Sequence, residues 1–114
     1  MMLSLEDVVD TIEILQTEEL ITWIEYGWVL PARHQESYRF TEIDVARVRL
    51  ISEMRHDCQI EVDAMPVVLG LLDQVYELRR QLNALAQAIE AQPSDVRDKI
   101  GQTVAEINRC SLKP

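Results

Sequence analysis

Glycine, cysteine and aromatic residues are scarce, with 3 glycines, 2 cysteines and 5% aromatic residues in a chain of 114. Two cysteines are too few for a disulfide framework and fit a reducing compartment. The three glycines are isolated and form no phosphate-binding loop. No apolar run approaches the roughly 20 residues of a membrane span, and no basic start precedes an apolar segment as in a secretory signal. These absences predict a small cytoplasmic protein without a membrane segment.

Positive charge is missing from the start of the chain. Residues 1–32 hold seven acidic residues and no Lys or Arg, whereas residues 33–58 hold five of each sign. Residues 59–114 carry eight acids and six bases, which completes the formal net charge of −9. Binding of a phosphate backbone normally requires clustered Lys and Arg, so the composition disfavours nucleic acid as a partner.

Motifs for catalysis are absent as well. No activated Cys or Ser beside a positioned base occurs in a recognisable pattern. The soft metal ligands are limited to His34, His56, Cys58 and Cys110, and His56 and Cys58 would diverge by about 200° on a helix. We therefore expect a protein that is not an enzyme and that holds no metal or cofactor.

Two short helices are expected first. Ser4, with Asp7 three residues later, is an N-cap signal, and the apolar spacing after it extends this helix toward Ile14. Thr17 is the candidate N-cap of the second helix. Gly27 is its expected left-handed terminator.

A small β-hairpin, or wing, is expected next. The segments Trp28–Pro31 and Tyr38–Phe40 are aromatic and β-branched, and the polar tract 32–37 separates them. Such segments are typical of short strands joined by a polar turn.

A third helix follows the wing. Thr41 and Asp44 form the sequence signature of a capping box, and the apolar face of the helix is expected to include Ile43. Helix, helix, hairpin, helix is the order of a winged helix-turn-helix domain, which we assign to residues 1–58.

The second half of the chain contains a long heptad helix. Asp63 is its candidate cap, which places Pro66 in the first turn, and at 1.5 Å per residue the helix to Ala91 is about 40 Å long. Such a seam needs a partner helix, so a homodimer is expected. The seam comprises Val68, Leu71, Val75, Leu78, Leu82, Leu85 and Ile89, of which Leu71, Val75, Leu78, Leu82 and Leu85 are the predicted dimerisation residues.

A last helix is expected from Ser94, after Pro93 ends the heptad helix. Its apolar residues again follow helical spacing, so it is able to fold back as an antiparallel hairpin. Residues 62–112 are therefore predicted to form a helical dimerisation hairpin.

Half of the aromatic residues, Trp23, Tyr26 and Trp28, fall within six positions. They fill a small core or, alternatively, one of them anchors a protein interface. The spacing alone leaves both possibilities open.

Several segments resemble the MerR-type helix-turn-helix regulators. The segments are Pro31–Arg33, Tyr38–Asp44 and Arg47–Ile51, followed by the heptad helix. The resemblance implies a mainly α fold: a MerR-like winged helix-turn-helix with a small β-hairpin, then a long helix and a C-terminal helix. The sequence departs from those regulators on the second helix, where Ile21 stands at a position that usually carries arginine.

A closer similarity is to chaperone-modulatory proteins of the CbpM type, a MerR-like branch, across about residues 18–82. This resemblance implies a protein that binds the J-domain of a DnaJ-like, DNA-binding co-chaperone of the CbpA type. It also implies inhibition of that partner's Hsp70 co-chaperone and DNA-binding activities. The segments that carry it are Glu18–Leu20, Gly27–Pro31, Tyr38–Phe40, Arg55–His56, Ile60–Glu61 and Val67–Asp73.

The J-domain contacts Hsp70 through a basic helix in this family, and an acidic surface is suited to compete for it. The candidate partner-binding residues are Glu6, Asp7, Asp10, Glu18 and Glu19, although first-turn helix charges in water are an equally ordinary explanation for them. The alternative function is a MerR-family DNA-binding transcriptional regulator. Its candidate phosphate contacts are Arg33, Arg39, Arg47 and Arg49.

Overall fold

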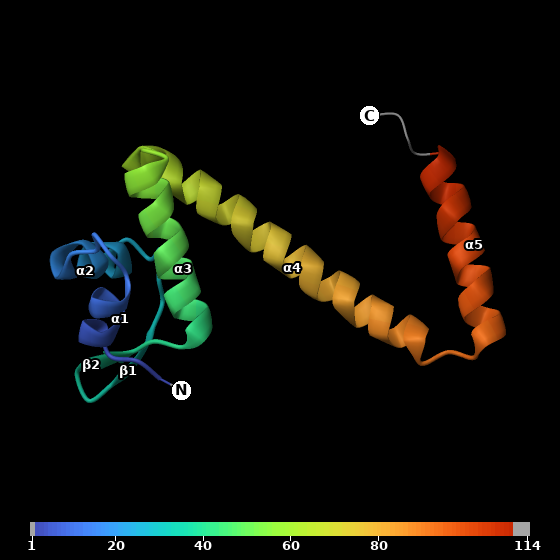
Figure 1. Ribbon diagram of the computed structural model, residues 1–114, viewed down its shortest axis with the longest axis horizontal. Coiled ribbons are helices and arrows are strands. Elements are labelled where there is room, and N and C mark those ends of the chain that lie inside the picture. Colours follow the sequence, from blue (N-terminus) through green and yellow to red (C-terminus); the bar gives the residue numbers. More distant parts are fainter. Residues whose placement is uncertain (1, 111–114) are drawn as a thin grey trace. The chain divides into compact units, whose positions relative to one another are not determined.

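The computed structural model describes residues 2–110 and confirms the expected mainly helical architecture with one small hairpin (Figure 1). The chain divides into two compact units, Met1–Gly70 and Leu71–Pro114. The elements are α1 (Leu5–Thr11), α2 (Thr17–Glu25), β1 (Ala32–His34), β2 (Ser37–Arg39), α3 (Glu42–Ser52), α4 (Met65–Glu90) and α5 (Ser94–Cys110).

One hydrophobic core holds the first unit together. Every helix from α1 to α4 contributes to it, so the first turns of α4 belong to this unit rather than to the remainder of that helix. Removing this apolar surface from water is the main favourable term for folding. The largest fully buried side chains are Phe40, Leu20, Ile51, Met65, Val8, Val29 and Val48.

Two capping boxes start helices as predicted. The Asp7 amide donates to the Ser4 hydroxyl (3.2 Å), and the Asp44 amide donates to the Thr41 hydroxyl (3.1 Å). In each box the aspartate carboxylate accepts from the backbone N–H of the cap residue, so two otherwise unpaired donors are satisfied. The prediction for α2 is wrong, because Gln16 is its N-cap and Thr17 is its first helical residue, without a side-chain cap.

Helix α1 is shorter than the spacing indicated. It ends at Thr11, because Ile12 is already extended (ψ 116°). Ile14 then adopts φ 73°, a left-handed conformation that a β-branched residue rarely occupies. Gly27 takes φ 80° just after α2, and this confirms the predicted terminator.

The first strand of the wing lies later in the sequence than expected, whereas β2 overlaps the predicted segment Tyr38–Phe40. Trp28 and Val29 are buried in the connection after α2, and β1 is formed by part of the tract that we had assigned to the turn. Gln35 (φ 50°) and Glu36 (φ 69°) make the two-residue turn between β1 and β2. Positive φ at both positions matches the strand twist, which explains why such a short connection suffices.

Helix α3 buries a different face than its first apolar residue indicates. Ile43 is 81% exposed, whereas Val45, Val48 and Ile51 are buried, so the expectation for Ile43 is wrong. The helix continues into a π-helical turn, Glu53–Asp57. A 3₁₀ turn, Val62–Ala64, precedes α4 and begins after Glu61, so Asp63 lies inside that turn and does not cap α4.

The second unit contains most of α4 and all of α5. The predicted dimerisation residues are all exposed in the single chain, from Val75 at 42% to Leu82 at 64%. On α5, Val104 and Ile107 are also exposed. No helix within residues 2–110 combines the length and the apolar character needed to cross a membrane. The second unit therefore presents apolar helix faces that the single chain does not cover.

Candidate protein-interaction surface

The outward face of α2 combines acidic and apolar side chains. Glu18 and Glu25 are exposed and lie two turns apart on one side of the helix, about 10 Å along its axis. Ile21 and Thr22 lie between them on the same side and are half-buried. The opposite side carries Leu20 and Trp23 into the core, so packing of the core fixes which residues face outward.

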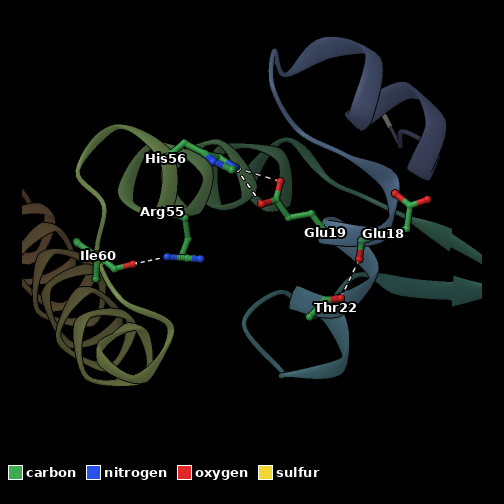
Figure 2. Close-up of polar contacts among 6 residues, drawn as sticks. All are labelled: Glu18, Glu19, Thr22, Arg55, His56 and Ile60. Carbon is green, nitrogen blue, oxygen red and sulfur yellow. Dashed lines mark hydrogen bonds and ion pairs between the residues drawn. The ribbon is translucent and has the colours of Figure 1, made fainter.

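Glu19 has a different role from its neighbour Glu18. Its Oε1 and Oε2 atoms lie 3.0 Å and 2.9 Å from Nε2 of His56, in the π-helical turn after α3 (Figure 2). Glu18 takes no part in this contact, and its backbone carbonyl accepts a hydrogen bond from the Thr22 hydroxyl (2.9 Å). Glu19 therefore connects two elements of the first unit, while the carboxylate of Glu18 remains exposed.

The three acids predicted on α1 also separate by role. Glu6 and Asp10 are exposed and lie one turn apart on the helix surface. Asp7 is exposed too, but its Oδ2 atom accepts a hydrogen bond from the Ser4 amide (3.1 Å) in the capping box. Of the five predicted partner-binding residues, Glu6, Asp10 and Glu18 present their carboxylates to solvent, whereas Asp7 and Glu19 stabilise local structure.

The four arginines of the DNA-binding alternative do not share one environment. The Arg47 Nε atom donates to the backbone carbonyl of Trp28 (2.5 Å), so this side chain joins α3 to the segment after α2. The Arg33 guanidinium lies over the Tyr38 ring, 5.2 Å from its centroid, and Arg39 is half-buried. Arg49 alone among the four lines a hollow in the first unit.

That hollow, of about 400 Å³, lies between the segment after α1 and the end of α3. Its lining includes the guanidinium of Arg49 and the imidazole of His56. It also includes the carboxylates of Glu13, Glu53 and Asp57. Mixed charge of this kind does not form the continuous basic surface that duplex binding requires.

The aromatic cluster divides between core and surface. Trp23 and Trp28 are buried, at 3% and 6% exposure, with ring centroids 6.3 Å apart. Tyr26 is 55% exposed, and its ring lies against Trp28 at 5.1 Å. An exposed tyrosine on a rigid aromatic base is suited to anchor an interface. The partner-binding residues predicted from the sequence do not include Glu25 or Tyr26. Glu25 lies seven positions after Glu18, which is two helical turns, so this spacing was sufficient to predict that both carboxylates share one side of α2.

Charge separates cleanly between the two units. Residues 1–70 hold 14 acids and 5 bases, a net charge of −9, and residues 71–114 hold six of each. All of the net charge of the protein therefore belongs to the first unit. Within residues 2–110, no group of three or more His, Cys, Asp or Glu side chains is arranged to hold a metal ion.

Two short helices, a wing and a third helix around one core define the first unit as a winged helix-turn-helix domain, with an acidic outward face on its second helix. The family model described as MerR HTH family regulatory protein matches residues 3–87. The chain belongs to this family. No curated protein and no solved structure matches it significantly.

Proposed function

We propose that this protein is a chaperone modulator that binds the J-domain of a DnaJ-like, DNA-binding co-chaperone. Binding would inhibit both the Hsp70 co-chaperone activity and the DNA binding of that partner. The proposal joins the resemblance to CbpM-type proteins with the membership of the MerR family. The dimer expected from the heptad seam is part of this proposal.

The outward face of α2 is the observation that carries it. In DNA-reading helix-turn-helix proteins the second helix enters the major groove. Here that helix presents Glu18 and Glu25 and contains no Lys or Arg. Two carboxylates facing phosphates repel them, whereas the same face attracts a basic helix of a protein partner.

Inhibition would follow from occlusion. The net charge of −9 on residues 1–70 steers a basic helix toward the first unit and raises the association rate. Ile21 and the exposed ring of Tyr26 provide apolar contact beside the carboxylates. A J-domain helix held in this way is no longer available to Hsp70.

The direct test is calorimetric titration of the full chain with the J-domain co-chaperone of its own cell. The Hsp70 ATPase rate is measured in parallel with and without the chain. We expect saturable binding, weaker at higher salt, and loss of the ATPase stimulation by the co-chaperone. Absence of both binding and inhibition for every J-domain protein of that cell overturns the proposal.

A charge-reversal pair locates the interface. We expect Glu18→Lys combined with Glu25→Lys to weaken J-domain binding by about tenfold or more, because both carboxylates change sign. The matched control is Asp98→Lys combined with Glu106→Lys, which changes the net charge equally on the exposed surface of α5. Equal weakening by both pairs would mean that binding depends on overall charge rather than on α2.

A DNA-binding regulator is the second candidate, and the family match is the observation that favours it. Selection of bound sequences from random duplexes tests it directly. Enrichment of a palindromic site, with loss of binding in Arg49→Ala and Arg33→Ala, would favour this function. It would also require that the acidic face of α2 does not face the DNA.

A further inference from the structure

The hollow of about 400 Å³ in the first unit has no role in the proposed function. One wall is the segment of residues 11–14 after α1, and the other is the end of α3 with the π-helical turn that follows it. Its volume falls within the range of about 300–1,000 Å³ that is usual for small-molecule sites. We propose that this hollow binds a basic α-amino acid, which carries one carboxylate and two cationic groups at neutral pH.

The wall formed by α3 and its continuation brings polar side chains to one side. Four of them follow the spacing of a single helix face, at steps of three, one and three positions: Arg49, Ser52, Glu53 and His56. The π-helical turn also places Asp57 in the lining. Turns of this kind are rare within helices and often occur at functional sites.

The charged groups of the hollow are complementary to a basic amino acid. Glu13, Glu53 and Asp57 provide three carboxylates and Arg49 provides one guanidinium, a formal balance of −2 when the histidine is neutral. Within residues 2–110 these four side chains form no hydrogen bond or ion pair with the protein. The ligand carboxylate would pair with the guanidinium, and its two cationic groups would pair with the carboxylates.

A buried hydroxyl distinguishes the hollow from an ordinary acidic surface. Ser52 is 6% exposed and lines the hollow, but its hydroxyl makes no hydrogen bond with any residue in the described part of the chain. In that part, every fully enclosed side-chain N or O atom has a partner, so this hydroxyl reaches the open space of the hollow. A buried polar group without a partner is costly, and a ligand group that bonds to it removes that cost.

Apolar surface is present on the opposite wall. Ile12 is 6% exposed and Ile14 is 65% exposed, and both line the hollow. The methylene chain of a basic amino acid is apolar, so it would lie against these side chains while its charged ends meet the polar groups. A hollow with an apolar wall and a few convergent polar groups is typical of small-molecule sites.

The test is calorimetric titration of the full chain with L-arginine and with L-lysine. We expect saturable binding of at least one of them, with a dissociation constant below about 1 mM. Norvaline lacks the cationic side-chain group and agmatine lacks the carboxylate, so each should bind about tenfold more weakly than L-arginine. Equal binding of either analogue, or no saturation by both basic amino acids at about 10 mM, overturns the proposal.

A pair of amide variants locates the site. Glu53→Gln combined with Asp57→Asn should raise the dissociation constant about tenfold or more, because two carboxylates of the hollow lose their charge. The matched control is Glu36→Gln combined with Glu42→Gln, which removes the same charge from exposed positions outside the hollow. Equal weakening by both pairs would mean that the ligand responds to overall charge, and this result also overturns the proposal.

The buried hydroxyl has its own variant. Ser52→Ala should weaken binding about threefold or more without lowering the free energy of unfolding, because the hydroxyl has no partner within residues 2–110 to lose. Unchanged binding in this variant and in the Glu53 and Asp57 pair would contradict the assigned site. These titrations use no co-chaperone, so their result is separate from that of the J-domain titration.

Discussion

His56 Nε2 lies 2.9 Å and 3.0 Å from the two carboxylate oxygens of Glu19, and this contact joins residues 37 positions apart in the sequence. It connects α2 to the turn that follows α3, beside the Arg55 guanidinium, which donates to the Ile60 carbonyl (2.6 Å) (Figure 2). The contact therefore ties α2, which carries the acidic face, to the end of α3 within the first unit.

Removal of this contact should lower stability modestly. We expect Glu19→Gln or His56→Ala to reduce the free energy of unfolding by about 0.5–1 kcal/mol, since both side chains are partly exposed. Urea denaturation measures the change. Glu18→Gln, one position away, should leave the stability within about 0.5 kcal/mol of wild type. An equal loss in both variants would contradict the different roles assigned to these two glutamates.

Caps provide a second pair of variants. Thr41→Ala should cost about 1 kcal/mol of unfolding free energy, because the amide of Asp44 loses its acceptor. Thr17→Ala should cost about 0.5 kcal/mol or less, since Thr17 makes no side-chain cap. Thermal or urea unfolding of both variants checks the difference, and a larger loss at Thr17 would contradict the observed start of α2.

Alanine variants of Arg47 and Arg49 test whether each arginine of α3 stabilises the fold or remains available for the DNA-binding alternative. Arg47→Ala should lose about 1.5–3 kcal/mol of stability, because the Trp28 carbonyl loses a charged donor. Arg49→Ala, on the exposed surface, should stay within about 0.5 kcal/mol of wild type. If Arg47→Ala were as stable as Arg49→Ala, the contact to Trp28 would have no structural value.

The heptad seam makes the fourth prediction. Replacing Leu78 and Leu82 by Lys should convert the dimer to monomers, because both side chains are exposed in the single chain and need a partner to be buried. Sedimentation measures the association state, and circular dichroism confirms that the first unit remains folded. Dimers of unchanged strength would mean that the seam is not the interface.

Local signals in the sequence were sufficient for most of the helices. The capping boxes at Ser4 and Thr41 and the terminator Gly27 each depend on residues three or four positions apart, so the sequence records them directly. Only the first strand of the wing was misplaced, because β1 and β2 flank a two-residue turn and β1 is therefore formed by residues 32–34 rather than by the run Trp28–Pro31. Trp28 and Val29 were assigned to a strand for their residue type, but burial in the core decided their conformation.

By itself, the amino-acid order determined the helices, the heptad seam and the concentration of negative charge in the first part of the chain, since these depend on short spacings and counts. Only the tertiary structure decided which charged groups are available to a partner. Asp7 and Glu19 are held in local contacts and Arg47 is held by Trp28, whereas Glu18 and Glu25 remain exposed on α2. The physical reason is that the contacts of Glu19 and Arg47 join residues 37 and 19 positions apart, which approach each other only when the core packs.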